Sequence, residues 1–480
     1  MKQPKPNFYL TDSLWQIMKG EERRGKLRDG YYSSQVREMS AQLKRLREEC
    51  RRLPKEQRII LRQDIQDLKS QLDETKKNEL KEKAYNISRR KISLDITTKV
   101  IRGHQAYVTN NLETMLVCQI IKLELRRSYR LYPADMNVII DQIKGLLDNP
   151  MPKIVIRADI RHFFESIPQQ VLVQKLIDDG FVSRQTIKYL KGVLFNYNIK
   201  TSNEQANGLP RGLAFSSHLS ELYMLSIDEK IKRTQGIYYY KRYVDDIIIV
   251  ADSSICSGEK YWELIKHIFE EKQLELHEDS DKKYIKPLDA EVQEASFEYL
   301  GYRFTYTKGK LIVGLSQKRF EKYKLLIDAV FDIYARCSHY RTLKKQPLKE
   351  GEGKYAKKDA LLQLFDRLEI LTSNGLLSGR KNYVATGIYY SNKHLTDLSQ
   401  LDSLDKYLQE KIEDKTSFNP PSNLFNYGKD NDYAKNIALI KHRLHEFSFK
   451  MGYEKRTLHK NGHFGRVLLD LQHIYHSIID

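Results

Sequence analysis

Three aspartates stand at or beside strongly hydrophobic runs. Asp159 lies near the end of the run KIVIRADI, and Asp245 and Asp246 lie between the β-rich runs IYYY and IIIV. Such runs favour buried strands, and carboxylates driven toward a packed sheet are costly unless a cation neutralises them. If the strands are neighbours, the three carboxylates converge at one place.

Carboxylates gathered in this way suit phosphoryl transfer from a nucleoside triphosphate. That reaction uses two divalent ions about 4 Å apart, one at the attacking hydroxyl and one at the leaving pyrophosphate. Mg²⁺ takes hard oxygen ligands and keeps several waters, so two or three acids on a rigid sheet suffice. We therefore predict a Mg²⁺ site, also open to Mn²⁺, with Asp159, Asp245 and Asp246 as ligands and the carbonyl of Ile160 as a backbone ligand.

The elements that must position these acids are short strands separated by helices. Lys153 to Ile160 predicts a buried strand, and Gly236 to Ala251 predicts a hairpin with the acids at its tip. Phe297–Phe304 and Lys310–Val313 predict another strand pair, with Lys308-Gly309 at its turn.

The flanking regions have helical patterns. Residues 36–94 carry two narrow apolar stripes among many charges and predict a helical hairpin, which is either an arm for oligomerisation or RNA binding or a solvated packing module. Beyond Leu315 the chain is predicted to be mainly helical, with an exposed basic connector at 344–358, a leucine-spaced helix at 395–408 and a break at 419–422.

The charge of the chain points to a polyanionic partner. Its 480 residues carry a formal net charge of +19, with a pI near 9.4. Such an excess favours nucleic acid, because binding releases counterions from phosphates, although a generically basic protein has the same charge. The four scattered cysteines fit a reduced cytoplasm, and no apolar run is long enough for a membrane span, so we expect a soluble cytoplasmic protein.

Four segments in one order resemble the palm motifs of reverse transcriptases. They are ADIRHFFESI at 158–167, GLPRGLAFSS at 208–217, YVDD at 243–246 and YLGY at 299–302. The resemblance implies an α+β right-hand polymerase with fingers, a palm with an antiparallel sheet, and a helical thumb. We accordingly expect a basic helical N-terminal extension over 1–96, fingers and palm over 97–315, and a helical thumb and C-terminal domain over 316–480.

The same resemblance implies roles for single residues. Asp159 and Asp245 match the principal metal ligands and Asp246 the assisting one. Phe164 matches the bulky gate against a ribose 2′-hydroxyl, which predicts deoxynucleotides (dNTPs) as substrates; its alternative is a core aromatic beside Phe163.

Further matches concern the substrate and the primer. Lys282 or Lys283 resembles the lysine that protonates pyrophosphate, the alternative being a solvated pair of charges. Leu300 and Gly301 match the strand that grips the primer terminus.

The substrate motif departs from many relatives, which carry glutamine where this chain has Arg211, next to Gly212. An arginine can contact a triphosphate or a template backbone with two hydrogen bonds. Upstream, Arg130 ends a basic run in the region expected for the fingers, where it either grips the triphosphate or forms a solvated helix end.

Within the family, the motifs look closest to bacterial defence-associated and abortive-infection reverse transcriptases, with retron and group II intron enzymes more distant. Such relatives act against phage, often with a small noncoding RNA as template or scaffold, and some form oligomers. We therefore expect an RNA template or noncoding RNA, a DNA product, and a homo-oligomer or a partner protein. Two alternatives stay open: untemplated or protein-primed DNA synthesis on the same fold, and a non-catalytic nucleic-acid-binding subunit.

Overall fold

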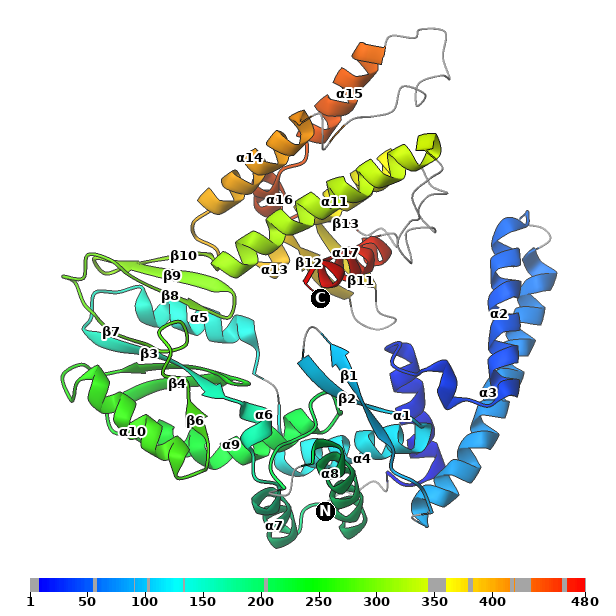
Figure 1. Ribbon diagram of the computed structural model, residues 1–480, viewed down its shortest axis with the longest axis horizontal. Helices are drawn as coiled ribbons and strands as arrows, with labels where there is room; N and C mark the ends of the chain where they lie inside the picture. The colour runs from blue at the N-terminus through cyan, green and yellow to red at the C-terminus, as the bar shows by residue number, and fades with distance from the viewer. Residues whose placement is uncertain are drawn as a thin grey trace. The chain divides into compact units, whose positions relative to one another are not determined.

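The structure is a computed structural model, and it is shown in Figure 1. It describes residues 8–54, 58–89, 91–101, 104–132, 134–202, 206–343, 360–378, 383–414, 418, 433–459 and 464–479. The predicted connector at 344–358 and the predicted break at 419–422 lie outside the described residues.

The chain divides into two compact units, each assembled from separate stretches of sequence. The first unit takes 1–134, 158–249 and 259–283, and the second takes 135–157, 250–258 and 284–480. The three aspartates singled out in the sequence all lie in the first unit.

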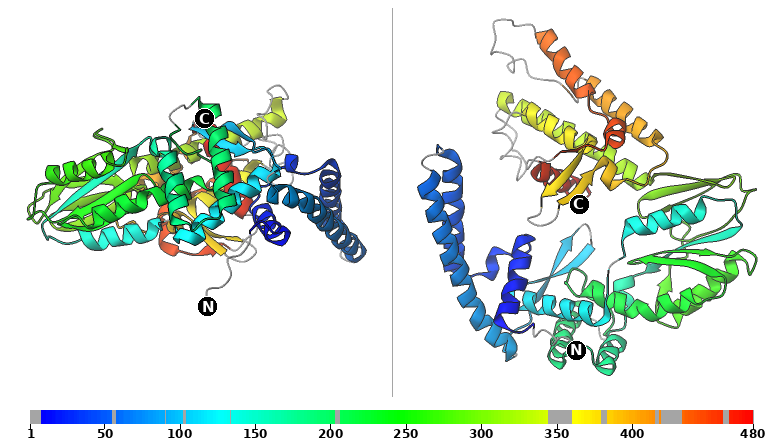
Figure 2. Two further views of the ribbon diagram at one scale, coloured as in Figure 1. Left: turned by 90° about the horizontal axis from the view of Figure 1, so that it is seen from below. Right: turned by 180° about the vertical axis from the view of Figure 1, so that it is seen from behind.

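The first unit begins with helices. α1 (Thr11–Arg23) is followed by α2 (Ser34–Arg52) and α3 (Arg58–Ser88), and the last two lie side by side in Figures 1 and 2. Their apolar stripes form a shared core around Val36, Leu43 and Leu72. The predicted helical hairpin is therefore confirmed, and its narrow core explains why so many of its side chains are charged.

A two-stranded ribbon and a group of helices complete the first unit around the sheet. β1 (Ile96–Ile101) pairs with β2 (His104–Thr109) in antiparallel register. The helices that follow are α4 (Leu112–Tyr129), α6 (Phe163–Ser166), α7 (Gln169–Asp179), α8 (Arg184–Thr201), α9 (Ser216–Lys232) and α10 (Gly258–Glu270). Asn111 caps α4 by accepting a hydrogen bond from the Thr114 amide at 2.7 Å, which satisfies one of the amides that a helix start leaves unpaired.

The central sheet brings the acid-bearing strands together. Its strand order is β4-β5-β3-β6, with β7 also paired to β3. The strands are β3 (Lys153–Arg161), β4 (Ile237–Tyr243), β5 (Asp246–Ala251), β6 (Glu275–Leu276) and β7 (Tyr284–Leu288). Residues 247–251 are fully buried, as a central strand requires. The predicted buried strand and the predicted hairpin are both confirmed, and they are neighbours.

The second unit contains the other predicted strand pair in a modified form. β9 (Tyr302–Thr307) and β10 (Lys310–Leu315) pair across Lys308-Gly309, as predicted. The single strand predicted over Phe297–Phe304 is wrong, because the chain turns at Leu300-Gly301, and β8 (Ala295–Tyr299) pairs with β9. Both turn residues have positive φ, at 49° and 81°, which is the backbone of a tight two-residue hairpin turn.

The C-terminal part is mainly helical, as predicted, and adds a small sheet that the sequence pattern did not indicate. Helices in this unit are α5 (Met136–Leu147), α11 (Gln317–Leu343), α12 (Ala360–Thr372), α13 (Ile388–Ser391), α14 (Ser399–Glu413), α15 (Tyr433–His445), α16 (Phe449–Lys455) and α17 (Phe464–Ile479). The sheet has the order β12-β11-β13, from Tyr383–Gly387, Asn374–Ser378 and Leu458–His459. No helix among the described residues is long and apolar enough to cross a membrane.

The buried central strand generates a first prediction. Replacing Ile248, which is fully buried in β5, with alanine should lower the free energy of unfolding by about 2–5 kcal/mol, because it removes apolar contacts and leaves a cavity. Ile199→Ala, at a site on α8 that is 61% exposed, is the matched control and should change stability by about 0.5 kcal/mol or less. Urea unfolding followed by circular dichroism measures both; equal midpoints for the two variants would contradict the assignment of β5 to the core.

Candidate active site

Asp159 lies near the end of β3 and is buried, yet its carboxylate is surrounded by cationic or potentially cationic groups. Lys282 Nζ lies 2.9 Å from Asp159 Oδ2, and His277 Nε2 lies 3.6 Å from Oδ1. The backbone joins the same neighbours, because the amide of His277 donates to the carbonyl of Asp159 at 2.9 Å. A buried carboxylate in this position requires positive charge beside it.

Asp245 lies in the turn between β4 and β5, next to the acid end of β3. The amide of Ile160 donates to the carbonyl of Asp245 at 3.2 Å, which ties the two acid-bearing segments directly. Burial raises the pKa of Asp245 and the charge of Asp159 adds to the rise, while Lys282 and Arg211 act in the opposite direction. The backbone of Asp245 is therefore bonded to the strand that carries Asp159, and the two carboxylates are close enough for the charge of one to raise the pKa of the other.

The carboxylate oxygens of Asp159 and Asp245 suit a hard divalent cation, whose other ligands would be water and substrate oxygens. Two converging carboxylates that repel each other are stabilised by a cation between them, and Mg²⁺ completes its shell with water and phosphate oxygens. Among the described residues no group of three or more His, Cys, Asp or Glu side chains has the arrangement of a metal site. Asp246 begins β5 directly after Asp245, and its role as a third ligand stays a prediction.

The substrate motif forms a loop that is hydrogen-bonded to the segment after Asp159. The amide of Leu209 donates to the carbonyl of Phe164 at 2.7 Å, and the amide of Gly208 donates to that of Ile167 at 2.8 Å. Two motifs that are separated by more than forty residues in the sequence are therefore held as one surface beside the acids.

Arg211 lies across this surface. Its NH2 donates to Glu165 Oε2 at 2.9 Å, and its Nε lies 2.7 Å from Oε1 in an ion pair without a second hydrogen bond. The guanidinium also lies over the ring of Phe164, 5.4 Å from its centroid. Phe163 is buried, whereas Phe164 lines a pocket, so the structure places Phe164 at a surface and leaves the core to its neighbour.

Gly212 is the position where the loop passes closest to the ribbon β1–β2. Its φ is +94°, and a Cβ there would lie 2.7 Å from the carbonyl oxygen of Tyr107. The amide of Tyr107 in turn donates to the carbonyl of Arg211 at 2.6 Å. Only glycine permits this approach, and it fixes the loop against the strand.

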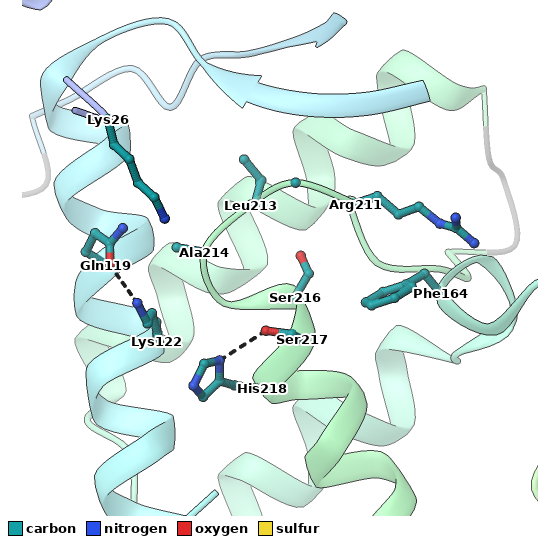
Figure 3. Close-up of a pocket in the computed structure, with 11 residues that line it drawn as sticks. Lys26, Gln119, Lys122, Phe164, Arg211, Leu213, Ala214, Ser216, Ser217 and His218 are labelled. Atoms are coloured by element: carbon teal, nitrogen blue, oxygen red, sulfur yellow. Dashed lines mark hydrogen bonds between the residues drawn. The ribbon is translucent and has the colours of Figure 1, made fainter. Parts of the chain in front are cut away.

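A pocket of about 500 Å³ opens between this loop and α4. Figure 3 shows Arg211 and Phe164 on one side of it and Lys26, Lys122 and His218 on the other. Burial lowers the pKa of Lys122 and of His218, and neighbouring cations lower both further. The gathering of like charges favours an anionic ligand.

Sequence reasoning missed the basic residues of this pocket. Lys122 shares a helix face with Gln119 and Arg126, three and four residues away, and that spacing was the available signal. Arg130 was predicted to bind substrate, but it does not line the pocket: it lies past the end of α4 with a left-handed backbone, at φ 51°.

The remaining predicted residues fall in two places. Of the two lysines left open by the sequence, Lys282 reaches Asp159, while Lys283 pairs with Glu278 at 3.2 Å. Leu300 and Gly301 belong to the second unit, where NH2 of Arg319 donates to the Leu300 carbonyl at 3.2 Å. The Arg319 guanidinium fills the space beside Gly301 that a Cβ would need.

The part of the chain that carries these residues matches a known protein family. Residues 75–304 match the family described as reverse transcriptase (RNA-dependent DNA polymerase). No functionally curated protein matches the sequence significantly.

Two telomerase structures are among the solved structures to which the chain is similar. The apo telomerase of Candida tropicalis, truncated from its C-terminal domain, is 13% identical, with 42% of this chain and 45% of that chain covered and a TM-score of 0.29. The telomerase of Candida albicans in complex with a fragment of telomeric RNA is 13% identical, with 75% and 54% covered and a TM-score of 0.35. The chain thus spans about half the length of each telomerase chain that it matches.

The family match is to reverse transcriptases in general, so the resemblance to the bacterial defence group stays a prediction. The α+β polymerase fold is confirmed. Residues 75–304 thus resemble a reverse transcriptase domain, the part of such enzymes that carries RNA-dependent DNA polymerase activity.

Proposed function

We propose that this polymerase adds deoxynucleotides with two Mg²⁺ ions held between Asp159 and Asp245. The observation that supports the proposal is the hydrogen bond from the Ile160 amide to the Asp245 carbonyl, which holds Asp245 next to the end of the strand that carries Asp159. Asp246 and the Ile160 carbonyl are the additional ligands in the proposal. When bound, the ions activate the attacking 3′-hydroxyl and neutralise charge on the leaving pyrophosphate.

The protein's own groups orient the nucleotide. Lys282, which pairs with Asp159, is a cation within reach of the reacting phosphates and is the proposed proton donor to pyrophosphate. The basic pocket beside Arg211 receives phosphate groups of the nucleotide or of the template, since Lys26 and Lys122 have no carboxylate among the residues that line it. Leu300 and Gly301 are the proposed grip on the primer terminus.

Phe164 is the proposed gate that selects deoxynucleotides. Its ring lines the pocket and is held from above by the Arg211 guanidinium, which is itself fixed by Glu165. A ring covered by this ion pair cannot move away from a ribose 2′-hydroxyl without breaking the contact with Arg211.

The biological setting of the proposal follows from the resemblance described above. We place the enzyme in the cytoplasm, in bacterial antiphage defence, with a noncoding RNA as template or scaffold and with a second copy or another protein as partner. The basic helical extension over 1–96 and the C-terminal domain over 316–480 are the parts proposed to hold that RNA and that partner, outside fingers and palm at 97–315.

One observation favours untemplated or protein-primed synthesis as a second candidate. Arg211 stands where many relatives have glutamine, and it is engaged by Glu165 and Phe164. Sequencing the DNA made by protein purified with its bound RNA separates the candidates. We expect products complementary to that RNA; random or homopolymeric products, or DNA attached to a tyrosine, serine or threonine of the protein, would favour the second.

The carboxylate pair generates the central mutational prediction. Asp245→Asn should lower the rate of dNTP incorporation on the order of 10³-fold, about 4 kcal/mol, because it removes charge at the metals while keeping the shape. Asp252→Asn is the control: this acid lies just beyond β5, where it accepts from the Ser254 amide at 2.8 Å, and we expect near-normal activity. Incorporation of labelled dNTPs with Mg²⁺ and co-purifying RNA measures both; equal incorporation by wild type and Asp245→Asn would refute the site and favour a non-catalytic subunit.

The gate generates a prediction about sugar selectivity. Phe164→Val should raise incorporation of ribonucleotides relative to dNTPs by roughly 10–200-fold, the range that a few methylene-sized contacts control. Phe163→Leu, at the buried neighbour, should reduce stability and leave that ratio unchanged. If the two variants have the same sugar preference as wild type in competition assays, Phe164 is a core aromatic and the gate assignment is wrong.

A further inference from the structure

Arg242 is a charged side chain close to the turn at Val244-Asp245, and every one of its N–H groups forms a hydrogen bond. The proposed reaction itself does not require this arginine. Arg242 lies on β4, three residues before Asp245, and its side chain is 4% exposed. A guanidinium has five N–H donors in a fixed fork, and a buried one is costly unless they are paired.

All five donors of Arg242 have a partner. Nε donates to Asp228 Oδ1 at 3.1 Å, and NH2 donates to Asp228 Oδ2 at 2.9 Å and to Glu221 Oε2 at 2.9 Å. NH1 donates to Glu221 Oε1 at 3.0 Å and to the carbonyl of Val244 at 2.7 Å. The four hydrogen bonds to Asp228 and Glu221 hold the guanidinium in place. The hydrogen bond to Val244 connects it to the turn that contains Asp245.

The two carboxylates come from one face of one helix. Glu221 and Asp228 are seven residues apart on α9, which is two helical turns. Tyr240, also on β4, donates its hydroxyl to Asp228 Oδ1 at 2.6 Å and so fixes that carboxylate from the strand side. Because α9 begins directly after the loop with Arg211 and Gly212, the network joins the substrate loop to the strand that leads to Asp245.

The Val244 contact falls on the most constrained residue of the turn. Val244 has φ 61°, in the left-handed region that β-branched residues rarely adopt. A two-residue hairpin turn requires positive φ at its first position, where glycine or asparagine is usual. A hydrogen bond to the Val244 carbonyl therefore stabilises a backbone that valine by itself does not favour.

The peptide units on both sides of Asp245 are thus fixed by different partners. The Val244 carbonyl is held by Arg242, and the carbonyl of Asp245 itself accepts from Ile160 on the strand that carries Asp159. We propose that Arg242 is a positioning residue, which sets the direction of the Asp245 carboxylate toward Asp159 and thereby the affinity of the site for its divalent cations. This inference rests on the proposed metal site.

Arginine is needed for this task, since lysine has three donors on a single nitrogen and cannot reach two carboxylates and a carbonyl in a planar fork. Arg242→Lys keeps the positive charge between Glu221 and Asp228, so it is the variant expected to fold. It should lose the Val244 contact. Glu221→Gln, in contrast, leaves Arg242 bonded to Asp228 and Val244 and removes only one charge.

The test is a titration of the full-length protein with Mn²⁺, in which electron paramagnetic resonance measures free Mn²⁺. We expect wild type to bind Mn²⁺ in a manner that Asp245→Asn abolishes. Arg242→Lys should weaken this binding roughly tenfold, the change that ~1.4 kcal/mol produces. The Mn²⁺ concentration that half-saturates dNTP incorporation should rise in parallel. KM for dNTP should stay within about twofold of wild type, because Arg242 has no proposed contact with the nucleotide.

Two controls separate positioning from stability. Lys76 on α3 is another buried cation, and it pairs with Glu22 on α1. Lys76→Met should lower the melting temperature without changing Mn²⁺ binding. Glu221→Gln should also leave Mn²⁺ binding within about twofold of wild type.

Each remaining outcome decides against a particular claim. Wild-type Mn²⁺ affinity in Arg242→Lys would overturn the inference alone, as would a tenfold loss in Glu221→Gln, which would mean that the ion pairs rather than the Val244 contact control the site. Absence of any Asp245-dependent Mn²⁺ binding in wild type would overturn the proposed metal site together with the inference.

Discussion

The site depends on one contact between neighbouring strands, the hydrogen bond from the Ile160 amide to the Asp245 carbonyl. It joins the end of β3 to the turn between β4 and β5, and it continues the pairing of β3 with β5 up to two aspartates that are far apart in the sequence. The packing of β5, which is fully buried over 247–251, holds that contact in place because the strand cannot shift register without exposing its apolar side chains. Burial of the apolar side chains of β5 therefore fixes the position of the turn that carries Asp245.

That pairing has an electrostatic cost, and the surroundings show how it is balanced. Burial raises the pKa of Asp245 and the charge of Asp159 adds to the rise, while the ammonium of Lys282 lies 2.9 Å from Asp159. Arg211 forms an ion pair with Glu165 in the adjacent substrate loop. The cations of Lys282 and Arg211 thus both favour the ionised form of Asp245.

Much of the site was predictable because its residues lie in patterns that a sequence displays. Hydrophobic runs marked β3, β4 and β5, and acids beside such runs marked Asp159 and Asp245. The turn at Leu300-Gly301 was missed because its flanks read as one continuous strand and leucine gives no signal for the positive φ that it adopts. Arg242 was missed for another reason: its partners on α9 lie 14 and 21 residues away, and only the folded chain brings them together. The choice of Lys282 over Lys283 likewise needed coordinates, since adjacent residues of the same type are indistinguishable by pattern.

The most direct test of this account is a crystal structure of the enzyme with Mn²⁺ and a non-hydrolysable deoxynucleoside triphosphate, with the metal located by anomalous scattering. The account predicts two anomalous peaks about 4 Å apart, both within bonding distance of Asp159 or Asp245 and of the triphosphate oxygens. Metal bound elsewhere, or a nucleotide whose α-phosphate lies away from these two carboxylates, would contradict it.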